Sequence, residues 1–291
     1  MPHRALLPLI LAMSALLFLS GCLDELGRPP RAPTPGVPHL KIMTFNLHRD
    51  RSNDERTIAA IGAPDADIVL LQETTAEWER VIAERYRDQY AYMLFAPKEN
   101  AGGLAVLSHV PLVDRGVMPV PGDWHPAWHV LAHTAGGPVQ ILNVHLRSLF
   151  EGDGIFATNY VATGKDHVYE MSLFMEGALA DVPMIIAGDF NESPDGRAVQ
   201  WLEARGFQNA LPIFNPEQST WQGGSVAKSL TMTIDHVMFD KAFEPLDAWV
   251  EPKVGSDHRP VMAWLELVPT DRAERTKAPL RERPPSEAQA Q

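Results

Sequence analysis

Six short apolar segments of the chain adjoin an Asn, Glu, His or Asp, residues whose side chains can bind a metal ion or transfer a proton. Taken singly, each has an ordinary structural explanation, because Gly-Asp-Phe-Asn is a good turn sequence and a histidine at a strand end often hydrogen-bonds a neighbour. Six such positions in one chain are better explained by a shared site. The residues are Asn46, Glu73, His145, Asp189 with Asn191, Asp235 with His236, and Asp257 with His258.

The apolar segments have the length and composition of buried β-strands bounded by turns. Asp54, Thr75 and Asp195 are suited to the N-cap or first turn of helices that follow them. The segment 103–120 predicts an additional hairpin. Alternating strands and helices predict a layered α/β fold, in which polar chemistry gathers at strand ends. Helices are expected at 54–61, 75–87, 165–180 and 198–205.

Eight motifs in a fixed order carry a family resemblance: Met43 to Leu47, Asp67 to Glu73, Gly103 to Ser108, Asn143 to Leu146, Gly188 to Asn191, Thr220-Trp221, Ile234 to Val237 and Ser256 to Val261. In this order they resemble the endonuclease/exonuclease/phosphatase superfamily, also called deoxyribonuclease-I-like. The Gln-Glu, Gly-Asp-Phe-Asn and Ser-Asp-His pieces are the most specific in combination. The resemblance implies an α/β fold of four layers, a sandwich of two facing mixed β-sheets flanked by helices, with the site at one rim.

The resemblance also implies a divalent metal site. Glu73 is then the main ligand, assisted by Asn46 and Asp257. Carboxylate and amide oxygens suit Mg²⁺ or Mn²⁺, and the absence of cysteine ligands argues against a structural zinc site. Such a cation neutralises charge that develops on the non-bridging oxygens of a phosphate ester under attack.

Proton transfer is assigned by the same resemblance. Asp189 and Asn191 orient the phosphate and the attacking water. His258 acts as general base and is oriented by Asp235, while His145 lies opposite as general acid or phosphate stabiliser. In-line attack on a phosphodiester needs groups on both sides of the phosphorus, which a pair of histidines can provide.

The chain departs from the abasic-site endonucleases of this superfamily. His48 stands where they usually have a second acidic residue, and His145 marks the class that has histidine in place of a catalytic tyrosine. This favours the branch of deoxyribonuclease-like nucleases, sphingomyelinases and phosphoinositide phosphatases. The segment 147–167 is either a lid or substrate wall, or a loop that packs its own aromatics. The segment 124–129 could stack a base or enter a lipid interface, although core packing is commoner, and no metal site is expected from its histidines.

The N-terminus resembles a bacterial lipoprotein signal. Arg4 precedes an apolar run at 5–19, which is shorter than the roughly 18–20 residues of a membrane-spanning helix. Leu-Ser-Gly-Cys at 19–22 resembles the lipobox, in which Cys22, the only cysteine, becomes the acylated first residue. The protein is therefore expected to be exported and anchored by lipid on the periplasmic or cell-surface side of a bacterial membrane. The expected divisions are a signal peptide at 1–21, an acylated Cys22 and Pro-rich tether at 22–38, the enzyme domain at 39–268 and a disordered charged tail at 269–291.

The formal net charge is −12, from 25 Lys and Arg against 37 Asp and Glu. This argues against nucleic-acid binding by a broad basic face, but not against a nuclease whose cation meets the phosphate. The expected function is that of a metal-dependent phosphoesterase, a phosphodiesterase that hydrolyses nucleic acid or a phospholipid or phosphorylated small molecule outside the cytoplasm. The expected partners are the phosphate-ester substrate, either nucleic acid or a phospholipid head group, and the membrane; we infer no protein partner and expect a monomer. The alternative is a non-catalytic lipoprotein that binds a phosphate ligand on the same scaffold. Serine-hydrolase, dinucleotide and P-loop motifs are absent.

Overall fold

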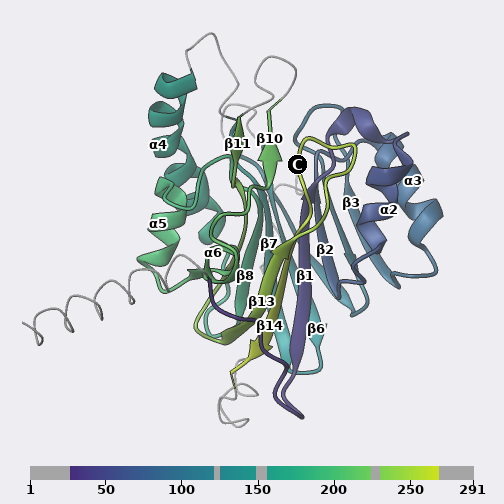
Figure 1. Ribbon diagram of the computed structural model, residues 1–291. Coiled ribbons are helices and arrows are strands. Elements are labelled where there is room, and N and C mark those ends of the chain that lie inside the picture. The colour runs from purple at the N-terminus through teal and green to yellow at the C-terminus, as the bar shows by residue number, and fades with distance from the viewer. Residues whose placement is uncertain (1–26, 121–124, 149–155, 224–229, 269–291) are drawn as a thin grey trace, which may run out of the picture.

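Two six-stranded β-sheets pack face to face in the computed structural model, which describes residues 27–120, 125–148, 156–223 and 230–268 (Figure 1). The first sheet contains, in spatial order, β13 (Phe243–Val250), β14 (Val261–Leu267), β1 (His39–Asn46), β2 (Ile68–Gln72), β4 (Leu104–Ser108) and β3 (Tyr92–Ala96). The second contains β5 (Leu112–Met118), β6 (Ala127–Thr134), β7 (Gly137–His145), β8 (Met184–Asp189), β12 (Asp235–Phe239) and β9 (Gln208–Asn209). A separate two-stranded sheet pairs β10 (Trp221–Gln222) with β11 (Thr231–Met232).

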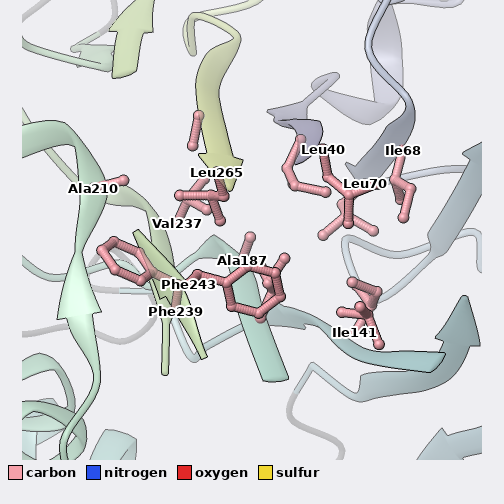
Figure 2. Close-up of a cluster of buried hydrophobic side chains, with 14 of the residues drawn as sticks. Leu40, Ile68, Leu70, Ile141, Ala187, Ala210, Val237, Phe239, Phe243 and Leu265 are labelled. Carbon is pink, nitrogen blue, oxygen red and sulfur yellow. The ribbon is translucent and has the colours of Figure 1, made fainter. Parts of the chain in front are cut away.

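The continuous apolar runs arise because the central strands are buried on both faces. Side chains alternate across a strand, so Ile68 and Leu70 of β2 point into the space between the sheets, whereas Val69 and Leu71 point outward. Figure 2 shows Leu70 of the first sheet together with Ile141 of the second in this inter-sheet core. The same alternation decides which residues reach the functional end of each strand.

Helices cover the outer face of each sheet (Figure 1). α2 (Glu55–Gly62) and α3 (Ala76–Tyr86) pack on the first sheet, and α4 (Phe156–Met175) and α5 (Arg197–Glu203) pack on the second. A 3₁₀ turn, η1 (Arg49–Arg51), follows β1, and α6 (Ala210–Phe214) contributes to the inter-sheet core. The expected α/β sandwich of four layers is therefore confirmed. Within the described residues, no helix is long and apolar enough to span a membrane.

The structure corrects three expectations about local elements. The segment 103–120 is not a hairpin, because β4 pairs within the first sheet and β5 within the second, so the chain crosses between sheets there. Asp235 does not end a strand but begins β12. The N-cap of α5 is Gly196 rather than Asp195, whereas Thr75 caps α3 by accepting a hydrogen bond from the backbone N–H of Trp78 at 3.3 Å.

The other helix predictions are confirmed with shifted ends. The helix expected at 165–180 begins earlier, at Phe156, and ends at Met175. Asp54 precedes α2, and its carboxylate accepts a hydrogen bond from the hydroxyl of Thr57 at 2.6 Å. The signal peptide, Cys22, Trp124 and the tail at 269–291 lie outside the described residues.

Part of the Pro-rich segment before β1 is attached to the domain. The backbone N–H groups of Arg28 and Arg31 donate to the carbonyls of Ile213 and Leu246 at 2.7 and 2.9 Å. The guanidinium of Arg31 also pairs with the carboxylate of Glu266 at 3.2 Å. The chain is thus held on the domain from Arg28 onward, which its composition did not indicate.

A buried layer of amides joins the two sheets between the apolar core and the functional rim. The side-chain amide of Gln72 in β2 donates to Oδ1 of Asn143 in β7 at 2.8 Å and to Oγ1 of Thr44 in β1 at 3.1 Å. The amide of Asn143 donates in turn to the carbonyls of Leu71 and Ala105, both at 3.1 Å. Because buried polar groups are costly when unpaired, this arrangement holds the two sheets in one relative position.

Candidate functional site

In β7, β8 and β12, the side chains that face the other sheet form a row from the apolar core to one rim of the sandwich. In β8, Ile185 and Ala187 lie in the core and Asp189 is the next residue on that face. The parallel pairing of β7 with β8 places His145 beside Asp189. The antiparallel pairing of β12 with β8 places Asp235 beside Asp189 from the other side. The register of three strands therefore brings these side chains together.

The turns that follow β1, β2 and β8 contain residues whose backbone is in the left-handed region. His48, Glu73 and Asn191 have φ values of 58°, 60° and 50°, a conformation that costs non-glycine residues of order 1 kcal/mol or more. A Cβ atom on Gly188 would lie 1.8 Å from the carbonyl oxygen of Val144, so only glycine allows the close approach of strands just before Asp189. Strained turns at the strand ends thus direct the polar side chains toward the rim.

These turns and strand ends enclose a cavity of about 310 Å³. The walls combine four histidines with four carboxylates, although the chain as a whole is acidic. Of the residues given a metal-binding or catalytic role from sequence, Asn46 and Asp235 are not part of the wall, but both hydrogen-bond residues that are. His236 points elsewhere, with its ring nitrogens near Asn209 and the carbonyl of Glu192. The lining residues are His48, Arg49, Asp50, Glu73, Ala101, His125, His145, Ser148, Asp189, Asn191, Trp221, Asp257 and His258.

Asp189 lies at the centre of the site, between the two histidines. Its Oδ2 atom is 3.6 Å from Nε2 of His145 and 3.6 Å from Nε2 of His258. The same oxygen accepts a hydrogen bond from the amide of Asn46 at 3.0 Å, and Oδ1 accepts one from the backbone N–H of Asn191 at 2.9 Å. Burial raises the pKa of Asp189 despite the attraction of His258. The carboxyl is therefore held in place by donors and is poised to exchange a proton.

His258 is held by a carboxylate pair. Its Nδ1 lies 3.0 Å from both carboxylate oxygens of Asp235. Burial lowers the pKa of His258, but the negative charges of Asp235 and Asp189 raise it by more than burial lowers it. The net shift is upward, and the imidazolium is favoured. The backbone of Asp235 is held in turn by Thr220, because the N–H group of Asp235 donates a hydrogen bond to Oγ1 of Thr220 at 3.1 Å.

His145 is held differently from His258. Its Nδ1 lies 3.0 Å from the carbonyl oxygen of Ala101, which can only accept, so Nδ1 carries the hydrogen. Burial lowers the pKa of His145, and the attraction of Glu73 does not reverse this. The two histidines therefore differ in charge: His258 favours the protonated form, and His145 favours the neutral form with Nε2 facing Asp189.

Glu73 is an ionised carboxylate in the wall of the same cavity. Burial raises its pKa, but the charge of His145 and hydrogen bonds from the backbone N–H of Arg49 and the amide of Asn46 lower it more, so the net shift is downward. Those two hydrogen bonds are both 3.1 Å long. An ionised carboxylate beside an amide side chain is a suitable start for binding a hard divalent cation, once the amide presents its oxygen in place of the N–H group that now donates to Glu73.

Asp257 supplies a second carboxylate to the same cavity. Its Oδ2 accepts a hydrogen bond from the indole N–H of Trp221 at 3.0 Å, and its carbonyl accepts the N–H of Gln222 at 3.0 Å. The preceding Ser256 donates its hydroxyl to the carbonyl of Asn46 at 2.8 Å. The short strand β10 and the end of β1 thus hold the Ser-Asp-His turn in place.

Two donor sets could bind a cation. Asp189, Asp235 and His258 offer ligand atoms within 4.8 Å of one another among the described residues. However, Asp235 and His258 already satisfy each other at 3.0 Å, and a cation there would break that pair. Asn46, Glu73 and Asp257 have the ligand types that suit Mg²⁺ or Mn²⁺, and binding there leaves the Asp235–His258 pair intact. The amide of Asn46 must turn for its oxygen to replace the N–H group that now faces Glu73 and Asp189. We favour this second set.

Several residues at the site were not identified as site residues from the sequence. Trp221 was quoted only as part of a motif, and Arg49, Ala101 and Ser148 carried no signal because they act through the backbone or lie on loops. His125 belongs to the segment 124–129, for which base stacking, a lipid interface and packing were all weighed, and it lines the cavity. The segment expected as a lid or loop begins beside the cavity at Ser148, and its residues 149–155 lie outside the described part of the chain.

A buried polar network connects α4 to the strand that carries His145. Nε2 of His167 lies 2.8 Å from the carbonyl of Arg147 and its Nδ1 lies 3.0 Å from the carboxylate of Glu192. Glu170 accepts the N–H of Arg147 at 3.2 Å through Oε2, while its buried Oε1 has no hydrogen-bond partner among the described residues. Both backbone groups of Arg147, two residues after His145, are therefore held from α4.

This network predicts a pH dependence of stability. Burial raises the pKa of Glu170 to about 7 from its ordinary value of 4.5. The folded state thus binds the proton more tightly than the unfolded state, so the stabilisation is complete below pH 4.5 and is lost as the pH rises through 7. Between pH 4.5 and 7 the free energy of unfolding of the wild type should therefore fall by about 3 kcal/mol on account of Glu170. The Glu170→Gln variant cannot titrate there and should not show this part of the fall.

Denaturant unfolding at a series of pH values would measure this difference. The Glu176→Gln variant is a matched control, because Glu176 is exposed near the end of the same helix. Parallel pH profiles for wild type and Glu170→Gln would contradict the assignment, since the buried carboxyl would then not be titrating with folding.

Comparison with known proteins agrees with this geometry. The model of the Endonuclease/Exonuclease/phosphatase family matches residues 43–258. UPF0294 protein YE0917 of Yersinia enterocolitica is 25% identical over 251 residues, which cover 81% of this chain and 87% of that protein.

Solved structures with the same fold include an endonuclease/exonuclease/phosphatase from Beutenbergia cavernae, with a TM-score of 0.63, 20% identity and coverage of 79% of this chain and 72% of that one. A humanized D. rerio TDP2 has a TM-score of 0.63 and 14% identity over 78% of this chain and 98% of its own. An AP endonuclease from Archaeoglobus fulgidus has a TM-score of 0.57 and 18% identity over 77% and 98%. Because the family match extends from β1 to the Ser-Asp-His turn, this protein belongs to the endonuclease/exonuclease/phosphatase family, whose members are generally metal-dependent hydrolases of phosphoester bonds.

Proposed function

We propose that this protein is a Mg²⁺- or Mn²⁺-dependent phosphodiesterase that acts outside the cytoplasm on nucleic acid or on a phospholipid head group. One observation carries the proposal: Asp189 lies between two histidines of opposite charge preference in a cavity that also contains the carboxylates of Glu73 and Asp257. The cavity thus contains both proton-transfer groups and carboxylates that suit a cation.

Three residues of the cavity, His258, Asp189 and His145, take different roles in the proposed reaction. His258, kept protonated by Asp235, provides positive charge for phosphate oxygens. Asp189 has a raised pKa and fixed lone pairs, which suits it to accept a proton from the attacking water. Nε2 of His145 faces the same space and, without a proton in this tautomer, can accept a hydrogen bond there, whereas Nε2 of protonated His258 holds a proton that can pass to the leaving oxygen. The role of His258 as general base stays a prediction, because it must first release its own proton.

The donor set supports a hard cation. Glu73 is ionised, and the oxygens of Asn46 and Asp257 belong to the ligand class that Mg²⁺ and Mn²⁺ prefer. A bound divalent cation would supply Lewis acidity to the phosphate oxygens and positive charge that favours the neutral form of the nearby imidazoles.

The choice of substrate is supported only in outline. The net charge of −12 and a cavity of about 310 Å³ favour recognition of one phosphodiester and its immediate neighbours over tracking of a long nucleic acid. A lipid anchor at Cys22 is a further part of the proposal, and it would place the enzyme close to phospholipid head groups.

Labelling with fatty acid in the host cell tests the anchor. We expect the label in the wild type but not in the Cys22→Ala variant, and equal labelling of the two would remove the anchor from the proposal.

A substrate panel tests the activity directly. Residues 23–291 would be incubated with plasmid DNA, abasic-site DNA, RNA, sphingomyelin, phosphoinositides and a chromogenic phosphodiester, in Mg²⁺, in Mn²⁺ and in chelator. We expect cleavage of at least one of them that chelator abolishes, and the preferred substrate then identifies the branch. A folded protein that binds the cation but cleaves nothing would favour the non-catalytic alternative, and one that binds no cation would refute the metal site.

A further inference from the structure

His125 lies on the site in a place that the reaction scheme above does not use. It precedes β6, its exposed fraction is 6%, and it lines the same cavity as Glu73 and His145. Its imidazole stacks on that of His145, with ring centroids 3.9 Å apart and an angle of 36° between the planes. The contact is made to the face of the ring, whereas the hydrogen-bonding contacts of His145 lie at its edge.

The two histidines that flank Asp189 are supported very unequally by hydrogen bonds. Nδ1 of His258 is held by two carboxylate oxygens at 3.0 Å, an ionic contact that fixes the ring strongly. Nδ1 of His145 is held by one neutral carbonyl, that of Ala101, at 3.0 Å. A single neutral hydrogen bond restrains the ring less than the ionic contact of His258 does, so packing against the face of His145 has a larger share in its orientation.

The segment that contains His125 also supports the carbonyl that His145 uses. A Cβ atom on Gly102 would lie 3.2 Å from Cδ of Pro126, so Pro126 packs directly against the loop at Ala101 and Gly102. Residues 125 and 126 thus contact both the ring of His145 and the loop that accepts its Nδ1–H. The stack and the acceptor form one support.

We propose that His125 is a positioning residue that holds the imidazole of His145 in its Nδ1–H tautomer with Nε2 directed at Asp189. This proposal rests on the proposed phosphoesterase function only for its effect on turnover. The orientation of the ring can be measured without any substrate. A positioning role also explains why an imidazole beside the cavity packs on a second imidazole instead of facing the open space.

The test compares His125→Ala, which removes the stacking ring, with His125→Phe, which keeps a flat ring of similar size. In His125→Ala we expect kcat to fall about tenfold to a hundredfold while KM changes little, because a ring displaced by a fraction of an ångström loses its alignment. In His125→Phe we expect most of kcat to return. His129→Ala is the control, because His129 is a buried histidine of the same segment that does not line the cavity.

Nitrogen chemical shifts of the His145 imidazole provide the second readout. We expect a single Nδ1–H tautomer in the wild type and in His125→Phe, and a mixture of tautomers in His125→Ala. If His125→Ala lowers the melting temperature but leaves the tautomer and kcat unchanged, His125 only fills space and the proposal is wrong. If the wild type cleaves no substrate, the proposed function fails, and the tautomer measurement still decides the role of His125.

Discussion

The Glu73→Gln variant is expected to lose roughly 100- to 1,000-fold in phosphodiester turnover through weaker binding of the cation, the scale seen when one preorganised electrostatic contact to a transition state is removed. Glu73 is an ionised carboxylate in the cavity wall, and no other carboxylate hydrogen-bonds Asn46 and the backbone of Arg49 together within the described residues. Glutamine has the same length but removes the negative charge. Binding of Mg²⁺ or Mn²⁺ measured by calorimetry should weaken in parallel with turnover.

The control for this variant is Glu77→Gln on the exposed surface of α3, where the glutamate pairs only with Arg80 at 2.7 Å. It makes the same chemical change away from the cavity and should leave turnover and cation binding as they are. Full turnover in Glu73→Gln, with cation binding retained, would remove Glu73 from the metal site. The donor set of Asp189, Asp235 and His258 would then be the one to test next.

The second large effect is expected from the Asp235–His258 pair. Asp235→Asn preserves the size of the side chain but removes the charge that, after the opposing effect of burial, raises the pKa of His258 most. We expect turnover to fall by about 100-fold or more, the contribution typical of a positioned acid or base. His258→Ala should cost at least as much and leave the fold intact.

The double variant separates a working pair from two independent residues. Because Nδ1 of His258 contacts both oxygens of Asp235, the two residues should act as a unit. Asp235→Asn with His258→Ala is then expected to be no slower than His258→Ala alone, since effects within a unit are not additive. A double variant whose loss equals the product of the two single losses would show that the residues act separately.

Local sequence predicted much of the fold because each strand carries its own signal. The apolar runs from Leu40 and Val261 coincide with β1 and β14 within one residue, since their burial on both faces demands continuous apolar residues. Thr75 was recognised as a helix cap for a local reason, a side chain that accepts a hydrogen bond three residues on. The segment 103–120 was misread as a hairpin because only three residues separate its two strands, and local pattern does not reveal which sheet a strand joins.

The order of the motifs determined the family and predicted the candidate site residues, because a metal site and a proton-transfer pair restrict which side chains can stand at the strand ends. The tertiary structure alone decided how they meet. The register of β8 against β7 and β12 places Asp189 between His145 and Asp235. Residues that act through their backbone or through a ring face, such as Ala101 and His125, carry no pattern in the sequence. Their contribution depends on which loops the two packed sheets bring together, and that is a property of the whole fold.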